Sequence, residues 1–97
     1  MKRSYLLLFN SHVGSKEDVG EFLDTREEII NWRTDLPNSY WLVSEMTARE
    51  LGTMMRVFTN DEGLFIVVEV TKNKQGWLPK AAWNFLNRRP NPSMRNE

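Results

Sequence analysis

The amino-acid sequence predicts a single α+β domain of ferredoxin-like type, with a βαββαβ order, an antiparallel sheet and an added C-terminal helix. Three observations predict this class. The 97 residues are enough for one small domain and too few for two. Forty per cent hydrophobic and 11% aromatic residues are typical of a packed core. Apolar runs with strand character alternate with stretches of helical spacing in the βαββαβα order.

The first half of the chain begins with a predicted strand and a predicted helix. Residues 4–10 form a continuous apolar run, which is typical of a strand covered on both faces. Residues 15–25 are predicted to be a helix, because Ser15 and Asp18 resemble a capping box at its start. Gly20 lies inside this helix, where a glycine costs up to ~1 kcal/mol of helix stability.

Residues 28–35 are compatible with either a strand or a helix. A helix would start from Thr25 and Glu28, which also resemble a capping box. A β-hairpin would instead place strands at 30–35 and 39–45, joined by the turn sequence Pro-Asn-Ser. The aromatic and β-branched residues of the second of these segments favour a strand there in either case.

The second half contains a helix, a strand and a final helix. Residues 47–58 combine a capping box with an apolar stripe, which predicts a helix. The β-branched run at 64–71 predicts a buried strand. Residues 77–89 are predicted to be a helix with a proline near its first position. The predicted domain therefore spans residues 1–89, and residues 90–97 are expected to be a disordered tail.

Composition limits the compartment and the chemistry. The chain has no cysteine, which excludes disulfides and thiolate metal sites and suits a reducing compartment. The N-terminal apolar run of residues 5–9 is shorter than the ~7–15 residues of a signal-peptide core. No segment approaches the ~20 apolar residues that span a membrane. We therefore expect a soluble, cytoplasmic protein with no membrane contact.

The charges cancel overall but are unevenly distributed. Residues 16–28 hold six acids against two bases, and residues 72–97 hold six bases against one acid. One interpretation is a basic surface that contacts nucleic-acid phosphates, and the other is two solvated faces of opposite sign. The candidate nucleic-acid contacts are Lys72, Lys74, Lys80, Arg88 and Arg89.

The four tryptophans also allow two interpretations. Aromatic side chains on a ferredoxin-like sheet can stack nucleic-acid bases, but the strand at 64–71 lacks the basic-aromatic signature of such modules. The alternative is that the indoles pack beneath helices or in a dimer interface. The candidate interface residues are Trp41, Trp77 and Trp83.

Several segments together resemble a known group of small proteins. The stretches "YLLLFN", "SYWLVS", "TARE", "LFIVVEV" and "GWLPKAAWNFL" look like the SinR-like proteins, which are related in fold to the small CRISPR-associated endoribonuclease family. In that family, the first strand typically ends in an aspartate, and a homodimer brings two such acids together around a metal. The resemblance places Asn10 at this position, following Phe9.

The replacement of an acid by an amide argues against metal-dependent phosphodiester hydrolysis. A carboxylate is a charged ligand suited to Mg²⁺, whereas a neutral amide oxygen contributes little charge. His12 could act as a base or a ligand, but a loop histidine facing water is the alternative. The sequence thus indicates a vestigial site at Asn10 and His12, with no catalytic residue, metal or cofactor expected.

The sequence favours a non-catalytic interaction or scaffold protein acting as a homodimer, with a protein partner as its expected ligand. A four-stranded sheet leaves one face and two edges to protect, and a second copy could cover them. The alternatives are a nucleic-acid-binding module and an endoribonuclease-like protein that lacks the acid of its first strand.

Overall fold

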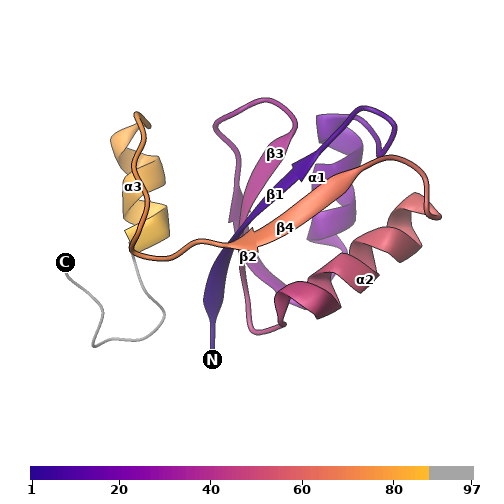
Figure 1. The fold of residues 1–97 in the computed structure, drawn as a ribbon, viewed down its shortest axis with the longest axis horizontal. Coiled ribbons are helices and arrows are strands. Elements are labelled where there is room, and N and C mark those ends of the chain that lie inside the picture. Colours follow the sequence, from indigo (N-terminus) through magenta and orange to yellow (C-terminus); the bar gives the residue numbers. More distant parts are fainter. Residues whose placement is uncertain (88–97) are drawn as a thin grey trace.

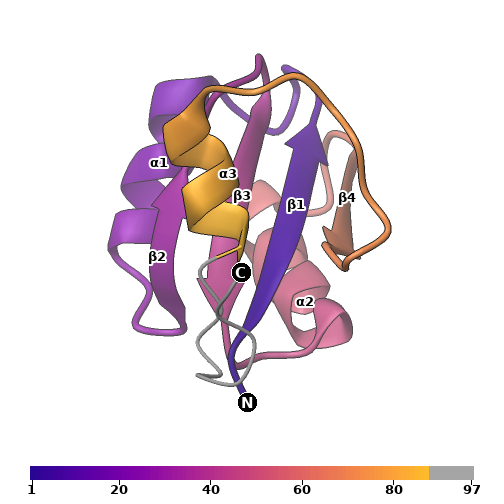
Figure 2. The same ribbon diagram turned by 90° about the vertical axis from the view of Figure 1, so that its left-hand side faces the viewer.

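The protein consists of one four-stranded sheet with helices on both faces (Figures 1 and 2). A computed structural model describes residues 1–87. The elements are β1 (Arg3–Phe9), α1 (Lys16–Asp24), β2 (Ile29–Arg33), β3 (Ser39–Ser44), α2 (Ala48–Thr59), β4 (Phe65–Glu69) and α3 (Lys80–Asn87). All neighbouring strands are antiparallel and follow the order β2-β3-β1-β4, so the predicted ferredoxin-like fold with an added C-terminal helix is confirmed.

The hydrophobic core lies between the sheet and the helices α1 and α2. Tyr5, Leu7 and Phe9 alternate along β1 toward this side and are buried. The apolar stripes of α1 and α2 complete the core, with Leu51 and Met55 among its buried members. The helix α3 lies on the opposite face, over β2 and β3 (Figure 2).

Both predicted capping boxes are present at the starts of the helices. Ser15 Oγ accepts a hydrogen bond from the backbone N–H of Asp18 at 3.0 Å, and the Asp18 carboxylate accepts from the Ser15 N–H at 3.3 Å. Thr47 and Glu50 make the same reciprocal pair at 3.1 and 2.9 Å. Each box satisfies two N–H groups that the first helical turn leaves without partners.

Residues 29–33 are a strand, so the hairpin interpretation is confirmed and the helical one is wrong. Thr25 is the C-terminal cap of α1, and its hydroxyl donates to the Phe22 carbonyl at 2.7 Å instead of starting a new helix. The buried Ser44 hydroxyl donates to the Glu28 carbonyl at 2.7 Å, which attaches the start of β2 to the end of β3. A long-range contact therefore decides what local propensity left open.

The helix α3 begins three residues later than the sequence predicts. It begins at Lys80, because the Pro79 carbonyl accepts the first helical hydrogen bonds, from the N–H groups of Ala82 and Trp83 at 2.9 and 3.3 Å. Residues 88–97 lie outside the described residues, and so do the predicted end of the domain and the predicted tail. Within residues 1–87, the longest helices are too short and too polar to cross a bilayer.

Gly20 is explained by a close approach rather than by helix propensity. Tyr40, on β3, points at α1, and its hydroxyl donates to the Lys16 carbonyl at 2.6 Å. A Cβ atom at position 20 would lie 2.6 Å from that hydroxyl oxygen. Burial raises the pKa of the Tyr40 phenol, with a further contribution from the carboxylates of Glu17 and Asp24. A glycine is therefore needed for Tyr40 to reach the helix backbone.

We predict that Gly20→Ala lowers the free energy of unfolding by about 1–3 kcal/mol, because the added methyl must displace Tyr40. Gly52→Ala is the matched control, since a Cβ there has no neighbour within 4 Å. That variant should gain about 0.5–1 kcal/mol from helix propensity alone. Urea unfolding measures both. Equal stabilisation by the two alanines would contradict the assigned role of Tyr40.

Candidate functional site

The end of β1, where the sequence predicts a vestigial site, is held by the side chain of Asn10. Its Oδ1 accepts hydrogen bonds from the backbone N–H of His12 at 3.2 Å and of Leu64 at 3.1 Å. The Asn10 backbone N–H also donates to the Leu64 carbonyl at 3.0 Å. The amide therefore joins the turn after β1 to the residue before β4, 54 positions later in the chain.

His12 lies in the same turn but contributes no side-chain contact to it. Within residues 1–87 its imidazole has no hydrogen bond or ion pair, and the residue is exposed. The backbone of the turn packs closely on Gly63, where a Cβ would lie 2.6 Å from the Val13 nitrogen. Gly63 has a φ of 81°, which glycine adopts freely. The described part of the chain holds no group of three or more His, Cys, Asp or Glu side chains arranged to bind a metal ion.

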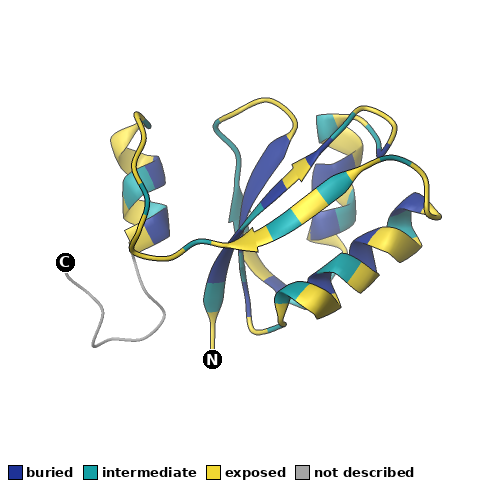
Figure 3. Ribbon diagram, viewed as in Figure 1, coloured by how far each residue is buried: buried dark blue, intermediate teal, exposed yellow. Residues whose placement is uncertain are grey.

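An exposed patch of apolar side chains lies on the α3 side of the sheet, on β1 and β4. Leu8 is directly opposite Ile66, and Leu6 is directly opposite Val68. Leu8, Ile66 and Val68 are 42, 54 and 45% exposed, respectively. We call these four residues the apolar strip. Figure 3 shows that no residue of β4 is buried, in contrast to β1 and β3.

The three predicted interface tryptophans have different environments. Trp41 is 9% exposed and lies directly opposite Leu6, on the face of the sheet that carries α3. Trp83, on α3, is half-buried. Trp77 is 99% exposed, so packing beneath a helix does not apply to it within the described chain and an interface role stays a prediction.

The basic residues proposed to contact nucleic acid are brought together only in part. Lys72 and Lys74 lie in the connection after β4, and Lys80 begins α3. The Lys74 ammonium donates to the Thr71 carbonyl at 3.0 Å. Arg88 and Arg89 lie outside the described residues. Nucleic-acid contact by this set stays a prediction.

A groove that the sequence does not predict lies between α1 and α2. Its volume is about 460 Å³. Its lining includes Phe22 and Phe58, which stack with ring centroids 4.2 Å apart, and the apolar side chains of Met46 and Met54. Val57, which is 77% exposed, stands at its rim. The sequence signal for this groove was Val57, an apolar residue that lies beside the apolar stripe of the helix predicted at 47–58.

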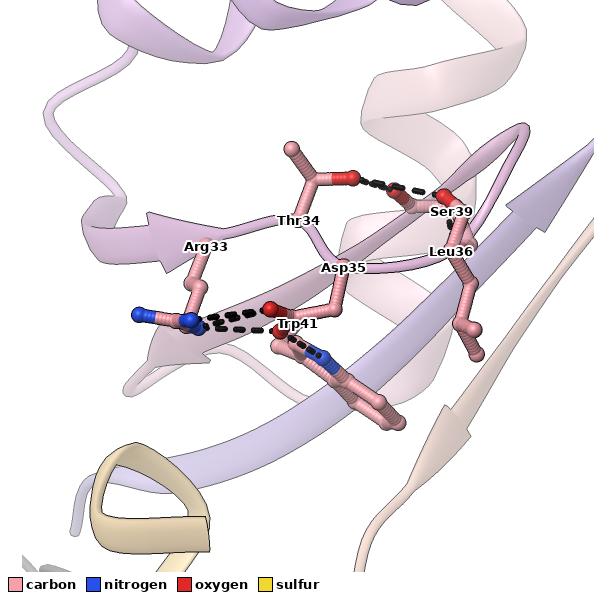
Figure 4. A network of polar contacts seen from close by, with 6 residues as sticks. All are labelled: Arg33, Thr34, Asp35, Leu36, Ser39 and Trp41. Carbon is pink, nitrogen blue, oxygen red and sulfur yellow. Dashed lines mark hydrogen bonds and ion pairs between the residues drawn. The ribbon is translucent and has the colours of Figure 1, made fainter. Parts of the chain in front are cut away.

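A partly buried polar network joins β2, the hairpin turn and β3 (Figure 4). The Arg33 guanidinium donates to the Asp35 carboxylate through Nε and Nη2 at 2.8–3.2 Å, and the Trp41 indole N–H donates to the same carboxylate at 3.0 Å. The Asp35 side chain is 6% exposed. The hydrogen bonds from Arg33, and secondarily that from Trp41, hold the pKa of the Asp35 carboxyl below its usual value, although burial opposes them.

The Asp35 carboxylate accepts from Arg33 on β2 and from Trp41 on β3, so this network joins the two strands of the hairpin. The sequence assigns Asp35 only to a turn position, and the ion pair with Arg33 was not foreseen. Such a charged pair with a depressed carboxyl pKa resembles a catalytic feature, but its geometry is that of a structural ion pair.

Comparison with known proteins identifies no relative. No protein-family model matches the chain, and no curated protein or solved structure is significantly similar to it. The resemblance to the SinR-like proteins therefore stays a prediction, and function is inferred from the residues themselves.

We predict that Asn10→Ala lowers the free energy of unfolding by about 1–3 kcal/mol, because two backbone N–H groups lose their acceptor. Asn10→Asp should be close to neutral at pH 7, since a carboxylate oxygen can accept both bonds. Ser11→Ala, at an exposed neighbouring position, is the control. Urea unfolding at pH 7 measures all three. An Asn10→Ala variant as stable as Ser11→Ala would show that the amide does not hold the turn.

We predict that Asp35→Asn costs about 1–2 kcal/mol at pH 7, because Arg33 loses its ion pair. The folded-state pKa of Asp35 is depressed, so its contribution is complete above the unfolded value of about 4 and is lost as pH falls through the folded value. The cost of the substitution should therefore shrink below about pH 4.

The Arg26–Glu28 pair supplies the control, because it has the same sequence spacing but lies on the surface, with side chains 41 and 36% exposed. Glu28→Gln should change stability by at most about 0.5 kcal/mol. Urea unfolding between pH 7 and pH 3 measures both variants. A cost for Asp35→Asn that does not depend on pH would contradict the ionic origin of the effect.

Proposed function

We propose that this protein is a non-catalytic interaction protein that acts as a homodimer. The observation that carries the proposal is the apolar strip, in which Leu8, Ile66 and Val68 are 42–54% exposed and adjacent across β1 and β4. Contiguous apolar side chains on a sheet face are a typical site of protein association. Burying them against a second copy would remove this surface from water, which is the main favourable term in association.

The state of Asn10 supports a non-catalytic role. In the endoribonuclease family that the sequence resembles, this position carries an acid that binds a metal. Here a neutral amide occupies it, and its oxygen already accepts two backbone hydrogen bonds. An amide used in this way contributes little to a site for a hard divalent cation. His12, the sole histidine of the chain, is exposed beside it.

Self-association also suits the distribution of charge and apolar surface. The acidic segment 16–28 lies on and after α1, whereas the apolar strip lies on the other face of the sheet, away from α1 and α2. A dimer formed through the strip would therefore leave the acidic segment and the groove between α1 and α2 exposed in both copies. These surfaces remain accessible to a protein partner.

We predict that sedimentation equilibrium finds a species of twice the 11.5 kDa chain mass. Ile66→Lys should raise the dimer dissociation constant about 30-fold or more, equivalent to ~2 kcal/mol, because it places an unpaired charge in the contact. Val57→Lys is the matched control, since Val57 is 77% exposed at the rim of the groove between α1 and α2. A monomer at all concentrations would contradict the proposal. Dissociation by Val57→Lys alone would show that the strip is not the contact.

A further inference from the structure

The outer edge of β4 has the backbone geometry of an open docking site. The Val70 N–H donates to the Ser4 carbonyl, and the Leu64 carbonyl accepts from Asn10, so the even-numbered residues of this segment point their backbone groups at β1. The backbone groups of Phe65, Val67 and Glu69 therefore point outward. β4 stands at the margin of the sheet (Figure 2), and within residues 1–87 no strand pairs with its outer side.

The strand β4 itself lacks three of the usual protections of an edge strand against pairing, namely a proline, a lysine and a bulge. Natural edge strands are commonly blocked by proline, by lysine, by a bulge or by a covering segment. The sequence Phe-Ile-Val-Val-Glu of β4 contains no proline or lysine, and its pairing with β1 is regular over all five residues. The one register irregularity in the described sheet lies in β2, at the other margin. The β4 edge is therefore suited to accept another strand.

We infer that the occupant of this edge is β4 of a second copy, paired antiparallel across a two-fold axis at Val67. The inference rests on the proposed homodimer and specifies its contact. The pairing would join two four-stranded sheets into one continuous sheet. It would also bring the apolar strips of the two copies side by side on the same face, since a two-fold axis perpendicular to the sheet preserves its faces.

Side-chain complementarity selects this register. Directly opposite residues of an antiparallel pair lie on the same face, so symmetric registers differ by steps of two residues. With Val67 opposite itself, Ile66 is opposite Val68 of the second copy, in a close pair without direct backbone hydrogen bonds. Ile66 and Val68, the most exposed apolar side chains of the strip, thereby contact each other laterally across the new strand pair.

The charges that flank β4 agree with the same register. Glu62 lies five residues before Val67 and Lys72 lies five residues after it, and both are exposed. Antiparallel pairing about Val67 therefore brings the turn before β4, which carries Glu62, to the same end of the contact as the segment after β4 of the second copy, which carries Lys72. A shift of two residues in either direction moves these two segments apart. Opposite charges at the rim help to set the register, although each exposed pair contributes little affinity.

Engineered disulfides can test the register of the pairing directly. The chain has no cysteine of its own, so any cross-link must join the introduced residues. Ile66→Cys and Val68→Cys proteins, mixed and mildly oxidised, should form a cross-linked heterodimer, because the paired Cα atoms would lie about 4.5 Å apart. Neither variant alone should cross-link. Cross-linking of Ile66→Cys alone, or of Val68→Cys alone, would overturn the register in favour of one shifted by two residues.

The same samples separate failure of this inference from failure of the proposed function. A dimer in sedimentation equilibrium without any cross-link would overturn edge pairing and leave the homodimer standing. A monomer at all concentrations, both for the unaltered chain and for the cysteine variants under reducing conditions, would overturn both. A cross-link restricted to the mixture, together with a dimer of the unaltered chain, supports both.

A charge exchange tests the flanking contacts independently. Glu62→Lys and Lys72→Glu should each raise the dimer dissociation constant about 2- to 10-fold, and the double variant should return to within about twofold of the unaltered chain. The single effects should shrink in high salt. Glu21→Lys, which makes the same charge change on α1, is the control. If the dissociation constant of the double variant instead rose by the two single effects combined, the pairing of Glu62 with Lys72 would be overturned.

Discussion

The organisation of this protein depends on the unequal coverage of its sheet. The helices α1 and α2, of nine and twelve residues, cover one face, and that face holds the main core. Within residues 1–87, the other face has only α3, of eight residues, which lies over β2 and β3. β1 and β4 are therefore left with exposed apolar side chains on that side, and β4 also has an open edge. Burial of apolar surface drives folding and association alike, so the part of the sheet that folding leaves uncovered is where association is favoured.

The residues with the most conspicuous chemistry serve the structure. Asn10, which the sequence offers as a candidate site residue, holds the backbone of the turn after β1. Asp35, the least exposed carboxylate in a described ion pair, neutralises Arg33 and accepts from the Trp41 indole. In both cases a buried or half-buried polar atom has satisfied partners from the protein itself, which stabilises the fold and leaves less of the side chain available for a ligand.

Local sequence patterns predicted the elements whose signals act over a few residues. The capping boxes at Ser15 and Thr47 involve side chains three positions from the N–H groups they accept, so the sequence contains the whole interaction. The sequence left residues 29–33 open between strand and helix, because the Ser44 hydroxyl, which bonds the carbonyl just before this strand, comes from 16 positions further along the chain. The groove between α1 and α2 was missed because it needs two helices whose relative position no local pattern specifies.

The sequence by itself determined the ferredoxin-like class, the two capped helices and the order of the elements apart from the strand at 29–33, because hydrophobic periodicity and capping are short-range. The tertiary structure alone decided what several residues are for. From the sequence alone, Gly20 only lowers the stability of its helix. In the folded protein a glycine is required there, because the Tyr40 hydroxyl packs against the backbone of α1. Ile66 and Val68 have the pattern of a buried strand, and the position of α3 leaves them exposed. Burial and close approach depend on residues far apart in the chain, which is why only the folded arrangement shows them.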